Sequence, residues 1–478
     1  MTLITPSHPS VPASVYAGRR SCLAKQMGTG SLAIIPTAPV QLRNRDCDFL
    51  YRPDSYFYYL CGFSEPDACL VVGGEGHSTL FCQPLDAAQE VWNGFRLGPA
   101  AAPAMLGVEA AFATSEMDAK LPDMLDGKDT VCYPFATHKG LETRVDGWLG
   151  QLRAKVRQGT LPPQHLGDLC GFLDAMRLIK DPHELSIMRR AAQISAAGHI
   201  RAMRLTARKL QAGQDLHEYH LDAELLHEFR RHGAQAQAYG SIVASGGNAC
   251  VLHYRAGARQ VNAGELVLID AACELDGYAS DITRTYPVNG RFSGPQRCLY
   301  ALVLAAQQAA IASTRPGARL DDLHDAAVRV LAQGLLDLHI LDANTVGGID
   351  DVIDKKAYAR FYMHRTSHWI GMDVHDCGSY VEPSERHIFS LRQDALTGQR
   401  VKHRPSCILR PGMALTIEPG VYVRAADDVP VAFHNIGIRI EDVAIVTDTG
   451  CELITRDVPV GIWEIEALMH EAKGIRQG

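Results

Sequence analysis

Short apolar runs alternate with amphipathic stretches over the first third of the chain. Residues 31–36, 68–72 and 78–82 have the length and apolar character of strands, whereas residues 16–27 and 141–158 carry apolar side chains at helical spacing. Strands that alternate with helices are typical of an α/β domain. We therefore predict a separate N-terminal α/β domain.

A helix start signal near Arg177 marks the beginning of a second domain. Asp181 is a favourable N-cap residue, and Pro182 suits the first helical position because no backbone N–H is needed there. A long amphipathic helix is expected from this point to about residue 207. We place the domain boundary here, so the two predicted domains are residues 1–176 and 177–478.

The second domain combines helices with short strands. Apolar residues at helical spacing predict helices over residues 216–232, 295–313 and 321–336. From Ala238 onward the other apolar runs are short and strand-like, which indicates an α+β domain. Residues 383–405 are rich in Arg, His, Pro and Gln, and we expect them to form an exposed loop.

Length, composition and charge narrow the class of protein. The chain has 478 residues, of which 46% are hydrophobic and 21% charged, and its formal net charge is −7. A single core rarely grows this large, so two or three domains are expected. We find no long Lys/Arg block of the kind that binds nucleic acid, which favours small molecules or peptides as substrates.

Cysteine usage and hydropathy favour a cytoplasmic protein. The thirteen cysteines are scattered without a C-x-x-C pair, so we expect neither a disulfide framework nor a cysteine-based zinc site. Residues 1–28 lack the apolar core of a secretory signal, and no apolar run approaches the ~18–20 residues of a membrane span. We therefore predict a cytoplasmic location and no membrane partner.

A predicted hairpin brings two aspartates together. A buried strand ends at Asp270, and Asp276-Gly277 is a favoured two-residue turn before the return strand. A tight turn sets the register so that Asp270 faces Thr283, with Asp281 diagonally across on the same sheet face, ~7 Å away. Two carboxylates so close in an apolar sheet repel each other, and metal ions between them would remove the repulsion.

Two more carboxylates lie in or at the end of apolar strands nearer the C-terminus. Glu418 ends an apolar run just before a turn, and Glu441 lies with Arg439 on the face of a strand opposite to its isoleucines. Burying an unpaired carboxylate costs several kcal/mol, so packing alone does not explain four of them. A shared metal centre explains all four.

Histidines are concentrated in one short segment. His364, His368 and His375 fall within twelve residues, and His253 lies apart from them. A single histidine is more often a hydrogen-bonded structural residue, but three together favour a site. His364 and His368 have the spacing of a helical zinc-binding pair, yet no glutamate follows the first histidine, so we reject that motif.

These motifs resemble those of the pita-bread metallopeptidases. The similar segments are 270–281, 367–369, 416–420 and 437–441, and the stretches 43–46, 51–63 and 281–290 are similar to bacterial aminopeptidase P. The resemblance covers nearly the whole chain. It implies an α/β N-terminal domain followed by an α+β pita-bread (creatinase/aminopeptidase-like) catalytic domain.

The resemblance implies a site for two divalent metal ions. The implied ligands are Asp270, Asp281, His368, Glu418 and a bridging Glu441. Four carboxylates and one imidazole form an oxygen-rich set that suits Mn²⁺, the metal that this family commonly uses.

The implied reaction releases the first residue of a peptide whose second residue is proline. Metal ions would activate a water molecule and polarise the scissile carbonyl. Glu418 would move the proton, and His375 and His253 would stabilise the tetrahedral intermediate as hydrogen-bond donors.

Other residues are implied to shape the site. His364 and Tyr380 match residues of the substrate pocket, and Arg439 matches the arginine beside the bridging glutamate. Trp92 matches a tryptophan that reaches the active site of a neighbouring subunit, which implies a homo-oligomer, a dimer or a tetramer. A half-buried packing role for Trp92 is the alternative.

Two features depart from the family pattern. Arg365 and Thr366 stand where glycine and a small apolar residue are expected, and residues 383–405 exceed the corresponding loop in length. Both features bear on the length and preference of the substrate, whereas the metal ligands are unaffected.

Two alternative functions remain. A prolidase would share the fold and ligands but require an Xaa-Pro dipeptide, so cleavage of Xaa-Pro-Yaa tripeptides separates the two enzymes. A non-catalytic pita-bread binding module is less favoured, because such proteins typically lose ligands and all five are present here.

Overall fold

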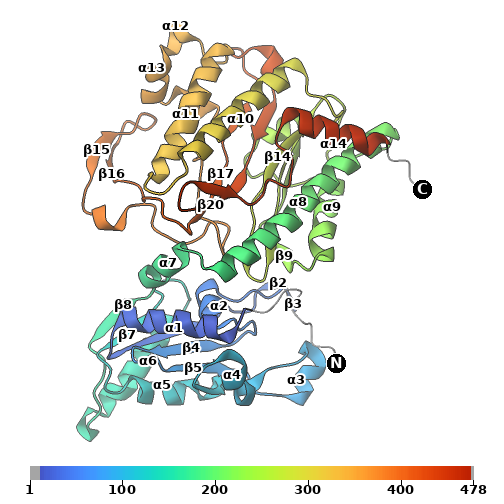
Figure 1. The fold of residues 1–478 in the computed structure, drawn as a ribbon. Helices are drawn as coiled ribbons and strands as arrows, with labels where there is room; N and C mark the ends of the chain where they lie inside the picture. The colour runs from blue at the N-terminus through green and yellow to red at the C-terminus, as the bar shows by residue number, and fades with distance from the viewer. Residues whose placement is uncertain (1–10, 475–478) are drawn as a thin grey trace. The chain divides into compact units, whose positions relative to one another are not determined.

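The chain divides into two compact units, Met1–Met176 and Arg177–Gly478. The computed structural model describes residues 11–474, and Figure 1 shows the course of the chain. Within this range no helix combines the length and the apolar character needed to cross a membrane.

The N-terminal unit is built on a six-stranded mixed sheet. In order across the sheet the strands are β6 (Ala110–Ala113), β5 (Ser78–Cys82), β4 (Cys69–Gly73), β1 (Ser31–Pro36), β7 (Thr130–Tyr133) and β8 (His165–Asp168). The predicted strands 31–36 and 78–82 coincide with β1 and β5, and the predicted strand 68–72 is found one residue later as β4. The central strands are buried on both faces, which explains their continuous apolar runs.

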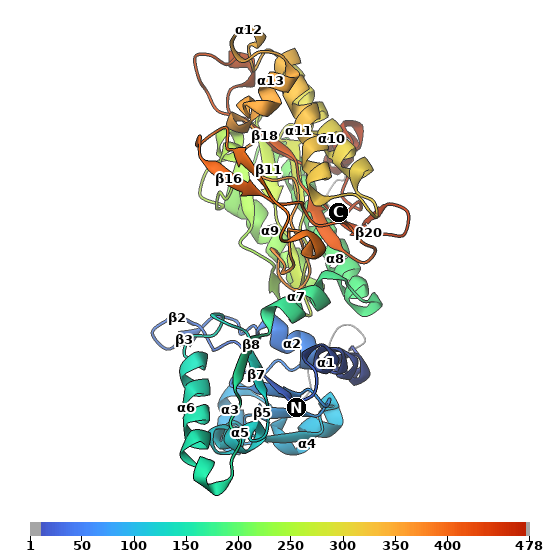
Figure 2. The ribbon, with the colours of Figure 1, turned by 90° about the vertical axis from the view of Figure 1, so that its left-hand side faces the viewer.

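Helices cover both faces of this sheet. On one face α5 (Met117–Leu125) and α6 (Leu141–Ala154) pack Leu121 and Trp148 against Ile34. The opposite face is covered by α1 (Ala13–Met27) and α2 (Ser55–Cys61), as Figures 1 and 2 show from two sides. The other α-helices and strands that begin in this part are β2 (Leu42–Asn44), β3 (Cys47–Asp48), α3 (Ala87–Asn93), α4 (Gly98–Leu106) and α7 (Cys170–Leu178).

The C-terminal unit contains two successive sets of helices and strands. The first set is α8 (Pro182–Gln211), α9 (Glu218–Arg231), β9 (Ala236–Gln237), β10 (Ile242–Ser245), β11 (Leu266–Asp270), β12 (Cys273–Leu275), β13 (Tyr278–Ala279) and β14 (Thr283–Pro287). The second set is α10 (Gly294–Ser313), α11 (Leu320–Asp337), β17 (Ala414–Ile417), β18 (Gly420–Val423), β19 (Ile436–Arg439), β20 (Asp442–Val446) and β21 (Cys451–Leu453). A final helix, α14 (Ile462–Gly474), packs against α8.

The predicted helix start at Asp181 is confirmed. The Asp181 side chain accepts hydrogen bonds from the backbone N–H groups of His183 and Glu184, and Glu184 reaches back to the N–H of Asp181. This reciprocal capping, with Pro182 at the first helical position, fixes the start of α8. The helix runs four residues further than predicted, to Gln211.

The predicted register of the aspartate hairpin is also confirmed. Asp270 pairs with Thr283 across β11 and β14, and the same register continues into β12 and β13. Asp276 and Gly277 both have positive φ, 49° and 80°, as a type I′ turn requires. The turn therefore determines which face of the sheet carries Asp270 and Asp281.

The prediction of an exposed loop over residues 383–405 is wrong in part. The segment is exposed, but it forms an antiparallel hairpin of β15 (Ser390–Gln393) and β16 (Arg400–His403). The tip is closed by Asp394, whose side chain accepts hydrogen bonds from the backbone and hydroxyl of Thr397. Polar composition concealed this hairpin because it buries no apolar face that would impose alternation.

The turn conformation provides a test of the register. Gly277→Ala places a Cβ on a residue with φ of 80°, so we expect the free energy of unfolding to fall by about 1 kcal/mol. Gly450→Ala is the matched control, since that glycine has open space around it and no positive φ is recorded there. Denaturant midpoints of the two variants measure the difference, and equal midpoints would contradict the turn assignment.

Candidate metal centre

One cavity in the C-terminal unit brings together almost all residues predicted for the site. Its volume is about 850 Å³. Ten predicted residues line it: Asp270, Asp281, His368, Glu418, Glu441, His253, His364, His375, Tyr380 and Arg439. The eleventh, Trp92, lies on α3 in the N-terminal unit with 84% of its surface exposed.

Asp270 and Asp281 converge on one tyrosine hydroxyl. The Tyr239 hydroxyl lies 2.5 Å from an oxygen of each carboxylate. Desolvation, and then the two aspartates, raises the pKa of Tyr239 well above its usual value, so the hydroxyl keeps its proton. It can donate that proton to only one carboxylate at a time. Further positive charge is therefore needed to balance the pair.

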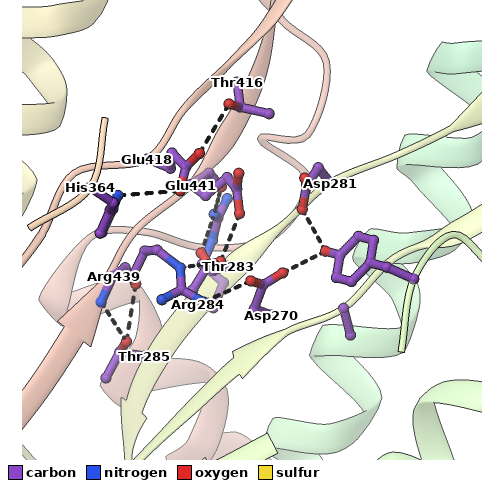
Figure 3. A network of polar contacts seen from close by, with 12 residues as sticks. Asp270, Asp281, Thr283, Arg284, Thr285, His364, Thr416, Glu418, Arg439 and Glu441 are labelled. Atoms are coloured by element: carbon purple, nitrogen blue, oxygen red, sulfur yellow. Dashed lines mark hydrogen bonds and ion pairs between the residues drawn. The ribbon is translucent and has the colours of Figure 1, made fainter. Parts of the chain in front are cut away.

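Arg439 and Thr283 join the hairpin to the strand that leads to Glu441. The Arg439 guanidinium donates to Asp270 Oδ2 at 2.7 Å, and its Nε donates to the Thr283 hydroxyl at 3.2 Å. That hydroxyl donates in turn to Glu441 Oε2 at 2.7 Å. Figure 3 shows Arg439, Thr283, Asp270 and Glu441 within one connected network.

The backbone at Glu441 is held by a buried arginine. Arg284, which is fully buried, donates to the Glu441 carbonyl oxygen and forms an ion pair of 2.8 Å with Asp442. A buried guanidinium needs such partners because its charge is costly to desolvate. Glu441 is thus fixed both at its side chain and at its main chain.

His368 and Glu418 reach the cavity from two adjacent segments. The backbone of His368 exchanges hydrogen bonds with Thr416 of β17, and Glu418 directly follows that strand. His368 Nε2 lies 3.5 Å from both Asp281 Oδ2 and Glu418 Oε1. Burial opposes protonation of His368, but Asp281 and Glu418 outweigh it and raise its pKa to about 9.

The donor set fits a bound cation. Burial, followed by repulsion from Asp281, raises the pKa of Glu441 well above its usual value. Burial also raises the pKa of Asp270, against the opposing charge of Arg439, and that of Glu418 to about 7, against the opposing charges of His368 and Arg439. Asp281, His368 and Glu441 each offer one ligand atom within 4.8 Å of the others, a span that one metal ion can bridge. A divalent cation would stabilise the ionised carboxylates that burial opposes.

The remaining histidines and Tyr380 form the walls of the cavity. His364 lies 2.8 Å from the Tyr422 hydroxyl, and burial followed by the charge of Arg439 lowers its pKa to about 3, so its ring is neutral near pH 7. His375 stacks edge-on against His368, with ring centroids 4.6 Å apart. The Tyr380 hydroxyl accepts the backbone N–H of Trp369 at 3.2 Å.

The unusual Arg365 also lines the cavity. Its guanidinium forms an ion pair with Asp321 at the start of α11, and His403 of β16 lies 3.8 Å from the same carboxylate. Thr366 is buried behind it and contacts the Tyr362 hydroxyl at 2.6 Å. The two departures from the family pattern, at Arg365 and in residues 383–405, therefore both contact Asp321.

Sequence reasoning missed Tyr239, Thr283 and Tyr422 as parts of the site. Thr283 could have been found, because the predicted register placed it opposite Asp270. Tyr239 precedes β10 in an irregular segment, and no spacing or pattern connects it to the hairpin. Tyr422, which bonds both His364 and Arg439, is one of four buried residues in β18 and was indistinguishable from core.

The chain belongs to the metallopeptidase family M24, whose model matches residues 186–448, and residues 16–133 match the aminopeptidase P N-terminal domain. It is 40% identical over 462 residues to the Xaa-Pro aminopeptidase of Escherichia coli (strain K12), covering 96% of this chain and 98% of that protein.

Solved structures agree with this assignment. The Pseudomonas aeruginosa aminopeptidase PepP superimposes with a TM-score of 0.88 at 44% identity, covering 97% of this chain and 99% of its own. Escherichia coli aminopeptidase P with the inhibitor Pro-Leu superimposes with a TM-score of 0.88 at 40% identity, covering 98% of this chain and 100% of its own. The predicted fold class, an α/β domain followed by a pita-bread catalytic domain, is confirmed, and the chain is a hydrolase of the metallopeptidase class.

The hydroxyl between the two aspartates yields a test. Tyr239→Phe removes the donor that orients Asp270 and Asp281, so we expect divalent-metal affinity to fall roughly 10- to 100-fold. Calorimetric titration with Mn²⁺ measures it. The control is Tyr286→Phe, whose hydroxyl contacts Thr206 in the core. Unchanged affinity in Tyr239→Phe would show that the hydroxyl does not support the metal ligands.

Proposed function

We propose that this chain is a metal-dependent aminopeptidase that releases the N-terminal residue from peptides with proline in the second position. The observation that supports it most is the convergence of four carboxylates and His368 in one cavity of about 850 Å³. Two relatives that it matches over nearly their full length are Xaa-Pro aminopeptidases.

The proposed ligands are Asp270, Asp281, His368, Glu418 and Glu441, which would hold two divalent ions. Manganese suits the set, since carboxylate oxygens predominate over a single imidazole. Bound ions would lower the pKa of water to give a nucleophile near neutral pH and would polarise the scissile carbonyl.

The protein side chains have separate proposed roles in the hydrolysis. As the oxygen of water forms a bond to the carbonyl carbon, Glu418 accepts its proton and passes it to the proline nitrogen when the C–N bond breaks. His375 and His253 donate hydrogen bonds to the oxygen that gains negative charge. The free amine of the substrate would lie against a bound metal ion or Asp270, and Arg439 keeps that carboxylate in place.

Selection of proline must work by shape. An Xaa-Pro bond is a tertiary amide without an N–H, so no acceptor on the protein can recognise it as a donor. His364 and Tyr380, which line the cavity, are the proposed substrate contacts.

A peptide panel tests the proposed function directly. Xaa-Pro-Yaa tripeptides and longer Xaa-Pro peptides should be cleaved after the first residue, whereas matched peptides with alanine in the second position should not. Exclusive cleavage of Xaa-Pro dipeptides would instead identify a prolidase. Metal binding without hydrolysis of any of these peptides would favour the binding module.

The bridging ligand gives a second test. Glu441→Ala should abolish hydrolysis and weaken metal binding but keep the fold, because Ile436, Ile438 and Ile440 pack the neighbouring strand into the core. Metal analysis of the wild-type chain should approach two equivalents of manganese. Full activity at one equivalent would refute the dinuclear site, and wild-type turnover of Glu441→Ala would refute the ligand assignment.

We further propose that the chain forms a homo-oligomer, a dimer or tetramer, through α3, and that Trp92 restricts the entrance of a partner's site. Val91 and Trp92 are 81% and 84% exposed on this helix, and Phe95 follows at 52%. An exposed apolar cluster of this kind is typical of protein contact surfaces.

A cytoplasmic location is also proposed. All thirteen cysteines are free, and several lie in the core. Burial raises the pKa of the Cys61 and Cys69 thiols to about 12, which makes them unreactive. Such thiols are compatible with a reducing compartment.

The role of Trp92 can be tested by length dependence. Trp92→Ala should lower the particle mass in solution and change the ratio of kcat/KM between tripeptides and longer peptides. Trp463→Ala, at a tryptophan that is 76% exposed on α14, is the control and should change neither. A monomeric wild type whose kcat/KM is unchanged by Trp92→Ala at every peptide length would exclude a shared entrance.

A further inference from the structure

The segment that carries His253 has little regular structure of its own. It begins with the short 3₁₀ turn Gly246–Cys250 after β10, and bends and turns connect it to Gly257. His253 lines the cavity from this segment. A hydrogen-bond donor aimed at the reacting oxygen must be held within a fraction of an ångström, so another group has to immobilise the segment.

Glu218 contacts this segment at several points. It is the first residue of α9 and is completely buried. Its Oε1 accepts hydrogen bonds from the backbone and hydroxyl of Ser245, both at 2.8 Å, and from Asn248 Nδ2 at 3.0 Å. Its Oε2 accepts from the Tyr254 hydroxyl at 2.8 Å and from the Gly257 backbone at 3.3 Å. The bonded residues flank His253 on both sides.

This carboxylate and the segment depend on each other. A buried carboxylate is costly unless donors occupy its lone pairs, and five donors do so here. Hydrogen bonds to an ionised acceptor are also stronger than neutral ones. Any movement of the segment would therefore leave the buried Glu218 carboxylate without some of its hydrogen-bond donors.

The opposite side of the segment is closed by β19. A Cβ on Gly437 would lie 2.3 Å from the Ala249 carbonyl oxygen, so only glycine allows the strand to pass this close. Arg424 also donates to the Cys250 carbonyl oxygen at 3.0 Å. The segment is thus held between the Glu218 carboxylate and the strand that carries Arg439.

We propose that Glu218 is a positioning residue of the active site, which holds residues 246–257 so that His253 faces the reacting oxygen. This role rests on the proposed aminopeptidase function and extends it to a residue that touches no substrate. Because His253 is proposed to act on the transition state, loss of Glu218 should lower kcat more than it raises KM.

A double-mutant cycle tests this role. Glu218→Gln keeps the shape of the side chain but replaces one carboxylate oxygen with an NH₂ group. This group cannot accept the hydrogen bonds that the oxygen accepts, so the donors that faced it lose their partner. We expect kcat for an Xaa-Pro-Yaa tripeptide to fall roughly 10- to 100-fold with little change in KM. His253→Ala should cause a similar loss, and the double variant should lose no more than His253→Ala alone.

The matched control is Glu228→Gln. Glu228 is also buried on α9, but its carboxylate pairs with Arg201, Arg231 and His232 and not with the segment. The Glu228→Gln variant should be less stable than the wild type, but its kcat should not fall as that of Glu218→Gln does. Manganese content should stay at the wild-type level in Glu218→Gln, because none of the proposed ligands is changed.

Additive losses in Glu218→Gln and His253→Ala would overturn the positioning role while the enzyme activity stands. A wild-type chain that hydrolyses no Xaa-Pro peptide would instead overturn the proposed function. If Glu218→Gln does not fold, Tyr254→Phe removes one of the five bonds beside His253, and the same cycle applies with a smaller expected loss.

Discussion

Mutual repulsion among carboxylates in a desolvated cavity is the constraint on which the C-terminal unit depends. Burial followed by like charge raises the pKa of Glu441, and burial raises that of Asp270 although Arg439 opposes it. Cationic and hydroxyl groups around the cavity donate hydrogen bonds to these carboxylates, chiefly Arg439, Thr283 and Tyr239. These groups offset only part of the negative charge, and metal ions would supply the rest. The excess negative charge of this cavity is therefore the property that favours the binding of cations.

Three of the proposed ligands lie at or beside the end of a strand. Asp270 is the last paired residue of β11, and Glu418 directly follows β17, so both carboxylates lie where a strand ends. Glu441 lies in the break between β19 and β20, where Arg284 binds its carbonyl oxygen. Strand ends allow a polar side chain to face a cavity while the adjoining apolar residues stay in the core.

Local pattern predicted much of this site, and long-range contact explains what it missed. The Asp276-Gly277 turn fixes a register, and from that register the neighbourhood of Asp270 and Thr283 follows. By contrast, Tyr239 and Glu218 act on segments that only tertiary folding brings near, and neither has a distinctive spacing in the sequence. The hairpin over residues 390–403 was missed for the opposite reason, since it lacks the apolar alternation by which strands are recognised.

The two successive sets of helices and strands contribute unequal parts of the centre, and this has a consequence for synthesis of the chain. Asp270 and Asp281 belong to the first set, whereas His368, Glu418 and Glu441 belong to the second. A nascent chain emerging from the ribosome therefore exposes an acidic pair long before its partners exist. With the proposed ligand set, hydrolysis requires residues of both sets, so it can begin only after the second set has folded against the first.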